Sequence, residues 1–244
     1  MQFGLESLGQ WTEPVETVVE RDATQAYAAA TNDPIAAHED GVQAPPIFAV
    51  VPVWGTMSTA MMGVVPPDAL AFVVHGEQDM RFHRPITPGM TLSSRAAPVG
   101  VHVKPNGTTV VVKVESRDAA DDGLVVEQYV TTFYRGVTGG EGAGEEAPDH
   151  KLTAAVKAGD PVATVEQMID EDQTFRYADA SGDRMPIHLD AEFATKVGLP
   201  GIIIHGLCTM AFTSWAAITA VAHGDPTRLR RLAVRFSQIG RAHV

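Results

Sequence analysis

The sequence repeats itself, and this repeat limits what the chain can fold into more than any other feature. Aligned with itself at one constant offset, the chain matches six pairs of similar residues in the same order. The pairs are Asp22 and Asp172, Thr24 and Thr174, Tyr27 and Tyr177, Thr31 and Ser181, Asp33 and Asp183, and His38 and His188. At a slightly larger offset, Arg81-Phe82 falls on Arg235-Phe236. The repeat therefore indicates that the chain contains two diverged copies of one unit, each with a helical segment and a strand.

A composition break separates the two copies. Residues 139–150 read GGEGAGEEAPDH, which is rich in glycine and acidic residues and lacks any large apolar side chain. Such a segment cannot bury surface, so we interpret it as a linker. It divides the chain into a first domain, 1–138, and a second domain, 151–244.

The second copy is shorter than the first. After Phe82 the first copy continues to Tyr134 and holds most of its predicted strands, whereas only eight residues follow Phe236. We therefore expect the sheet of the second domain to be incomplete. Residues 239–244, IGRAHV, resemble a translated sequencing adapter, which predicts that native sequence ends near Gln238 and that the gene continues.

The pattern of side chains predicts both strands and helices. Residues 107–116 and 124–134 are rich in β-branched and aromatic side chains and follow turn residues, which favours an antiparallel sheet. Composition indicates helices at 22–31 and 53–62. Residues 207–222 are apolar on almost every side, which predicts a buried helix wrapped by a sheet.

Composition also argues against several classes of function. The chain has 30 acidic and 18 basic side chains and a net charge of −12, so we expect no nucleic-acid partner. The single cysteine, Cys208, cannot form an intrachain disulfide or a multi-thiolate metal site. The apolar run at 207–222 is shorter than the ~20 residues of a membrane span, and the N-terminus does not resemble a signal peptide. We expect a soluble cytoplasmic protein.

One turn carries the pair of residues best suited to chemistry. Asp183 and His188 lie five positions apart, and Gly182 and Pro186 force the backbone to turn around them. The turn can bring the carboxylate and the imidazole together over one water molecule, as an acid and a base that work near neutral pH. Taken alone, each residue also has a plainer interpretation, as a turn residue or a structural hydrogen-bonding group.

The start of the apolar helix offers a third group. The first N–H groups of a helix lack internal partners and carry the positive end of its dipole, so Gly206 can donate to a developing oxyanion. Together with Asp183 and His188, this provides the groups needed to add or remove water beside a thioester. We interpret His205 as a structural residue that fixes the loop before Gly206.

Two further groups bear on how a ligand is held. The basic residues gather in one cluster, Arg228, Arg230, Arg231 and Arg235. This cluster is either a solvated face or a site for a phosphate-bearing ligand. Three methionines either fill a core or line an apolar channel: Met57, Met61 and Met62.

The combination of motifs resembles the MaoC-like, type-2 (R-specific) enoyl-CoA hydratases in their two-domain form. The matching motifs are Tyr177, Ser181-Gly-Asp183, Pro186-Ile-His188, Asp190 and Ile204-His-Gly-Leu-Cys-Thr209. The resemblance implies an α+β double hot-dog fold: two antiparallel sheets, each wrapped around a central helix, with the second truncated at its C-terminus. It also implies that Asp183 and His188 form the catalytic dyad and that the Gly206 N–H binds the thioester oxygen. We place the substrate-binding groups at Tyr177, Ser181, Arg230, Arg231 and Arg235.

The chain departs from the family pattern in two places. Met185 stands where family members usually have asparagine. The first copy keeps Asp33 and His38 but has Phe48-Ala49 in place of His205-Gly206, so it lacks the oxyanion donor. We therefore interpret the first copy as a non-catalytic domain that accommodates the acyl tail.

The predicted function is that of a hydro-lyase. Water adds reversibly to a trans-2-enoyl-CoA to give an (R)-3-hydroxyacyl-CoA, in fatty acid or steroid side-chain metabolism. We expect neither a metal nor a redox cofactor, an acyl-CoA as the binding partner, and leave open a homodimer. Two alternatives remain open: a non-catalytic acyl-thioester-binding protein, and a 3-hydroxyacyl-carrier-protein dehydratase of fatty acid or polyketide synthesis.

Overall fold

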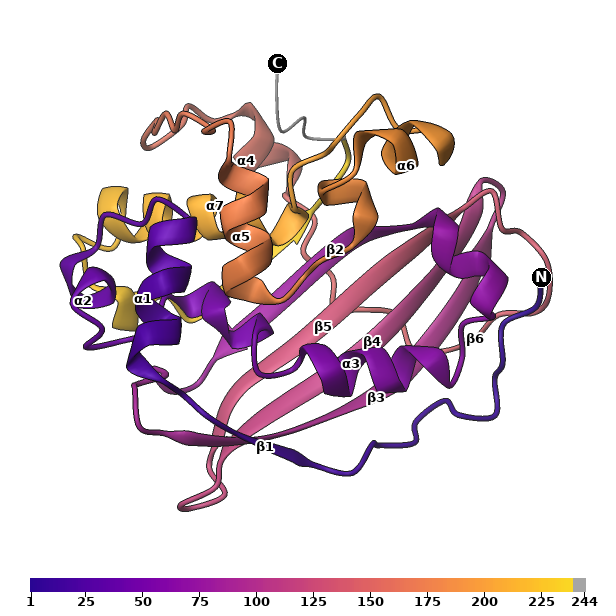
Figure 1. Cartoon of the computed structure of the whole chain (residues 1–244), viewed down its shortest axis with the longest axis horizontal. Coiled ribbons are helices and arrows are strands. Elements are labelled where there is room, and N and C mark those ends of the chain that lie inside the picture. Colours follow the sequence, from indigo (N-terminus) through magenta and orange to yellow (C-terminus); the bar gives the residue numbers. More distant parts are fainter. Residues whose placement is uncertain (239–244) are drawn as a thin grey trace.

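The computed structural model describes residues 1–238, so the predicted non-native segment 239–244 lies outside the described residues. The described strands form one antiparallel sheet (Figure 1). In spatial order they are β1 (Val15–Val18), β3 (Thr91–Lys104), β4 (Gly107–Asp118), β5 (Leu124–Arg135), β2 (Val73–Phe82) and β7 (Arg231–Arg235). A two-residue strand, β6 (Ala143–Gly144), also pairs with β3.

Helices cover one face of this sheet and gather at one end of it (Figure 1). The α-helices are α1 (Arg21–Ala30), α2 (Ala36–Glu39), α3 (Trp54–Met62), α4 (Ala154–Ala158), α5 (Gln173–Ser181), α6 (Ala191–Lys196) and α7 (Gly206–Ala220). Short 3₁₀ turns occupy Pro46–Val50, Pro67–Phe72, Pro186–His188 and Pro226–Arg228. Among the described residues, no helix combines the length and the apolar character that crossing a membrane requires.

The predicted antiparallel strands of the first copy are confirmed. Strands β3 and β4 form a hairpin in which Lys104 pairs with Gly107 across a two-residue turn. A side chain at Gly107 would overlap the Tyr134 carbonyl of β5, so only glycine fits there. The helices predicted at 22–31 and 53–62 are present as α1 and α3, and α3 packs against β3 and β4.

The prediction of two separate sheets is wrong for residues 1–238. The second copy contributes only β7 to the described sheet, and β7 pairs with β2 of the first copy, with Leu232 opposite Met80. An unpaired edge strand exposes N–H and C=O groups, and β7 satisfies those of β2. The domain boundaries stay a prediction, although β6 gives the expected linker two residues that pair with the sheet.

Helix α7 is buried mainly by the first copy, not by a sheet of its own. It packs beside the Pro46–Val50 turn and shares one apolar core with side chains of both copies. Its other side remains open in the described structure, since Thr209 and Thr213 are exposed. The expectation that a sheet wraps this helix is therefore not met within residues 1–238.

The two copies are joined where helix α1 ends. The last carbonyls of a helix have no partner within it and need one from elsewhere. Here they accept hydrogen bonds from the second copy: Gln173 Nε2 donates to Ala30 at 2.7 Å, Arg176 Nη1 to Ala29 at 3.0 Å and Trp215 Nε1 to Thr31 at 3.1 Å. Beside them the hydroxyls of Tyr27 and Tyr177 lie 3.1 Å apart in the core. Side chains of the second copy thus satisfy the carbonyl groups at the end of a helix of the first copy.

Replacing Gln173 tests this junction. Its amide is fully buried, so Gln173→Leu leaves the Ala30 carbonyl without a partner in the protein interior. We expect the free energy of unfolding, measured by urea denaturation, to fall by about 1–3 kcal/mol. The control is Arg184→Gln, which removes only the exposed ion pair with Asp179 and should change stability by less than about 1 kcal/mol. Equal stability of the two variants would contradict the role of the junction.

Candidate active site

Asp183 is held by the end of helix α5. The helix ends at Ser181, and Gly182 adopts a left-handed conformation with φ of 79° that turns the chain away. The Asp183 N–H donates to Ser181 Oγ at 3.2 Å, and Asp183 Oδ1 accepts from the Met185 N–H at 3.2 Å. Ser181 therefore contacts the backbone of the acidic residue, and its predicted contact with substrate stays a prediction.

His188 lies at the end of the 3₁₀ turn that follows. Its Nδ1 lies 2.8 Å from the carbonyl oxygen of Ile203, and since a carbonyl only accepts, Nδ1 carries the proton. The neutral ring then has an unprotonated Nε2, which is the form that can accept a proton. The sequence-predicted turn thus brings Asp183 and His188 together with the imidazole in a basic tautomer.

His205 supports this pair. Its ring stacks on that of His188 with centroids 3.8 Å apart, and its Nε2–H donates to the Asp183 carbonyl at 3.0 Å. Thr174 Oγ1 lies 3.0 Å from the other nitrogen. Burial lowers the pKa of His205 to about 3, so the ring stays neutral. The predicted structural role of His205 is confirmed.

Burial acts on the two dyad residues in opposite directions. It raises the pKa of the Asp183 carboxyl and lowers the pKa of the His188 imidazole, because each charged form loses its hydration. The attraction between the charged forms opposes both shifts. Burial therefore favours the uncharged form of both groups.

The same motif in the first copy is closed. Asp33 Oδ2 and His38 Nδ1 bond directly at 2.8 Å, and His38 is completely buried. Asp33 Oδ1 accepts the Ile35 N–H, and His38 Nε2 has no partner among the described residues. This arrangement leaves no room for a water between carboxylate and imidazole.

Gly206 begins helix α7 as predicted. Within residues 1–238 its N–H donates no hydrogen bond, which leaves it available to a ligand. A β-carbon at this position would lie 3.1 Å from the Phe236 ring, so glycine also gives the ring room. Gly206 lines the same cavity as Asp183 and His188.

Two cavities meet at the dyad. One, of about 280 Å³, is mostly apolar and runs along α3, where Met57, Met61 and Met62 line it. The other, of about 390 Å³, lies on the Gly206 side. Residues that line both are Val74, His75, Asp183, Ile187, His188 and Leu207. Sequence reasoning missed His75, because nothing in the local pattern of β2 distinguishes it.

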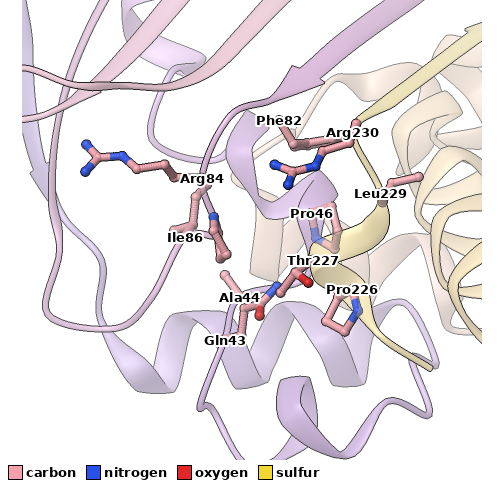
Figure 2. Close-up of a pocket in the computed structure, with 11 residues that line it drawn as sticks. Gln43, Ala44, Pro46, Phe82, Arg84, Ile86, Pro226, Thr227, Leu229 and Arg230 are labelled. Atoms are coloured by element: carbon pink, nitrogen blue, oxygen red, sulfur yellow. The ribbon is translucent and has the colours of Figure 1, made fainter. Parts of the chain in front are cut away.

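The predicted substrate-binding residues lie away from these cavities. Tyr177 is completely buried against Tyr27. Two of the arginines pair with acidic residues of β2: Arg231 with Asp79 at 2.7 Å, and Arg235 with Glu77 at 2.7 Å. Arg230 lines a small pocket together with Phe82 and Arg84, and in Figure 2 it lies beside Phe82 while the Arg84 side chain points away from it. A role for these residues toward substrate stays a prediction.

The histidines and aspartate could in principle hold a metal ion. One ligand atom each of Asp183, His188 and His205 lies within 4.8 Å of the others. Both nitrogens of His205 already have partners, the Asp183 carbonyl and Thr174 Oγ1. Two free ligand atoms remain, fewer than the three protein ligands usual at a catalytic zinc.

Comparisons with known proteins find relatives of both halves of the chain. Residues 153–241 match the MaoC like domain, and residues 35–136 match the MFE-2 hydratase 2 N-terminal domain. The peroxisomal enoyl-CoA hydratase 2 of Arabidopsis thaliana is 28% identical over 172 residues, which cover 68% of this chain and 55% of that protein. The 3-hydroxyacyl-thioester dehydratase Y of Mycobacterium tuberculosis is 33% identical over 200 residues, which cover 79% and 65%.

The chain thus spans 55% and 65% of the length of these two relatives. A solved MaoC-like dehydratase from Phytophthora capsici has the same fold, with a TM-score of 0.85 and 25% identity, over 98% of this chain and 84% of that one. The peroxisomal multifunctional enzyme type 2 of Drosophila melanogaster shares the fold with a TM-score of 0.74 and 24% identity, over 93% and 41%. The similarity to these solved structures confirms the predicted α+β hot-dog class. Both halves are matched in order along the sequence, and the chain belongs to the MaoC-like dehydratase family.

Proposed function

We propose that the protein is a hydro-lyase that adds water reversibly to a trans-2-enoyl thioester of coenzyme A and gives the (R)-3-hydroxyacyl thioester. The observation that carries the proposal is the convergence of three groups on one cavity: the Asp183 carboxylate, the unprotonated nitrogen of His188 and the free N–H of Gly206. The first two can take up a proton and give it back, and the third is an oxyanion donor; water addition beside a thioester needs these functions together.

The chemistry follows from these positions. The dyad holds a water molecule and removes one of its protons as the oxygen forms a bond to the β-carbon. Electron density moves onto the thioester oxygen, where the Gly206 N–H and the positive end of the α7 dipole stabilise it. The dyad then returns the proton to the α-carbon. Dehydration is the same sequence reversed.

The apolar cavity suits the acyl chain. Methionines from α3 and the side chains of Val50, Val53 and Leu70 line it, and it contacts the dyad at one end. Burying methylene groups there would contribute about 0.8 kcal/mol each. The first copy, whose own motif is closed, would therefore serve as the acyl-binding half. Relatives named for a thioester dehydratase and an enoyl-CoA hydratase support this class of substrate.

Replacing the dyad tests the proposal. Asp183→Asn and His188→Ala each remove proton transfer, so we expect hydration of crotonyl-CoA, followed by loss of enoyl absorbance, to slow by about 10²–10⁴-fold. The matched control is Asp33→Asn, which makes the same change in the closed pair of the first copy. It should retain most of the turnover per folded molecule. Near-normal hydration by Asp183→Asn would refute the assignment, and the same acyl group on a carrier protein tests the carrier-dehydratase alternative.

The pH dependence of the rate provides a second test. His188 must be neutral to accept a proton, and burial lowers its pKa below the ordinary value of 6.5. The neutral form therefore persists as the pH falls through 6.5. We expect kcat/KM for hydration to remain level from neutral pH to below this value, with the acid limb centred lower still. Loss of activity centred at or above the ordinary imidazole pKa, in initial-rate measurements, would contradict this picture.

A further inference from the structure

A chain of buried amide groups crosses the sheet and ends at His75. Gln128 Nε2 donates to the Ala49 carbonyl at 3.0 Å, and Gln78 Nε2 donates to Gln128 Oε1 at 2.9 Å. Gln78 Oε1 then faces His75 Nε2 at 3.1 Å. Gln78 and Gln128 are only 1% and 0% exposed, so each of these polar groups needs its partner.

The direction of this chain is fixed by its far end. A carbonyl such as that of Ala49 can only accept, so Gln128 must donate to it and turn its own oxygen toward Gln78. Gln78 must likewise donate to that oxygen and accept from His75. The Glu77 carbonyl, 3.2 Å from the same His75 nitrogen, imposes the same assignment. His75 is therefore protonated on Nε2 and has a bare Nδ1.

The charge of His75 is fixed as well. Burial lowers its pKa to about 4, so the ring is neutral in the range where the dyad works. Phe236 packs edge-on against it with centroids 5.2 Å apart. The ring is therefore uncharged and fixed in orientation, and its Nδ1 can accept a hydrogen bond.

His75 lines the same two cavities as the dyad. His75, Asp183 and His188 are the three polar residues among those that line both cavities. A regular strand would turn His75 and Gln78 to opposite faces, but the register of β2 shifts between His75 and Glu77. Such a bulge re-aims side chains, and here both residues line the apolar cavity.

We propose that His75 Nδ1 accepts a hydrogen bond from the O–H that the attacking water keeps, which becomes the O–H of the 3-hydroxyl group. This inference rests on the proposed function. A water molecule has two hydrogens, and the dyad removes only one of them. The second hydrogen needs an acceptor both before and after the C–O bond forms, and His75 Nδ1 is a neutral acceptor in the same cavity. His75 is a positioning and specificity residue that recognises the hydroxyl of a 3-hydroxyacyl thioester.

Binding measurements separate this role from catalysis. In the Asp183→Asn protein, which should not interconvert the ligands, (R)-3-hydroxybutyryl-CoA and butyryl-CoA differ only in the hydroxyl. We expect calorimetry to show about fivefold tighter binding of the hydroxyacyl thioester, the effect of one net hydrogen bond. Adding His75→Phe should abolish that preference and leave the affinity for butyryl-CoA nearly unchanged. An undiminished preference would overturn the inference.

A second variant tests the amide chain without touching His75. Gln128→Met keeps the side-chain length but cannot donate to Ala49 or accept from Gln78. We expect it to reduce the hydroxyl preference and to shift the His75 ¹⁵N signals from the Nε2–H tautomer toward a mixture. A pure Nε2–H tautomer with full preference in this variant, or an Nδ1–H tautomer in the unmodified protein, would refute the positioning role.

The same binding measurements distinguish a failure of the His75 role from a failure of the proposed function. If butyryl-CoA binds but the hydroxyl makes no difference, the role of His75 fails while the thioester site stands. If neither thioester binds to Asp183→Asn, the proposed function itself fails, and the inference falls with it.

Discussion

Hydrogen bonds from the second copy to the last carbonyls of α1 hold the molecule together, and the position of the site depends on them. They anchor α5 and α7 to the first copy through the side chains of Gln173, Arg176 and Trp215. Asp183 follows α5 by only one glycine, so fixing this helix fixes the carboxylate. The cavity that the carboxylate lines is built largely by α3 and the sheet of the first copy. Neither copy has the whole site.

The same sequence motif produces a closed pair in one copy and an open pair in the other. Asp33 and His38 bond directly, whereas His188 turns Nδ1 to the Ile203 carbonyl. A carbonyl partner satisfies one ring nitrogen and leaves the other, with the Asp183 carboxylate, facing a cavity. The spacing of the two residues along the chain therefore does not determine whether the pair is closed or open. The two pairs differ in the partner of the imidazole Nδ1, which is a carboxylate in one copy and a backbone carbonyl in the other.

The features that could be predicted from the sequence are those that depend on local patterns. The repeat, the strands of β4 and β5 and the turn that carries Asp183 and His188 follow from local patterns, and the structure contains them. The single sheet does not, because it arises from the pairing of β7 with β2, which depends on tertiary packing. That register also pairs Asp79 with Arg231 and Glu77 with Arg235, contacts that the sequence pattern did not predict. The role of these two arginines toward a ligand stays a prediction.

His75 could not be predicted for a related reason. Alternation in a strand assigns each side chain to a face, and the bulge at Gly76 breaks the alternation at this point. Two buried amides would destabilise an apolar sheet if left unpaired, yet each is satisfied in a chain that ends on the Ala49 carbonyl. Because every member of the chain has one allowed orientation, the imidazole has one as well. A polar group in an apolar cavity can fix the orientation of a ligand only if its own donor and acceptor sides are fixed, and the amide chain meets that condition.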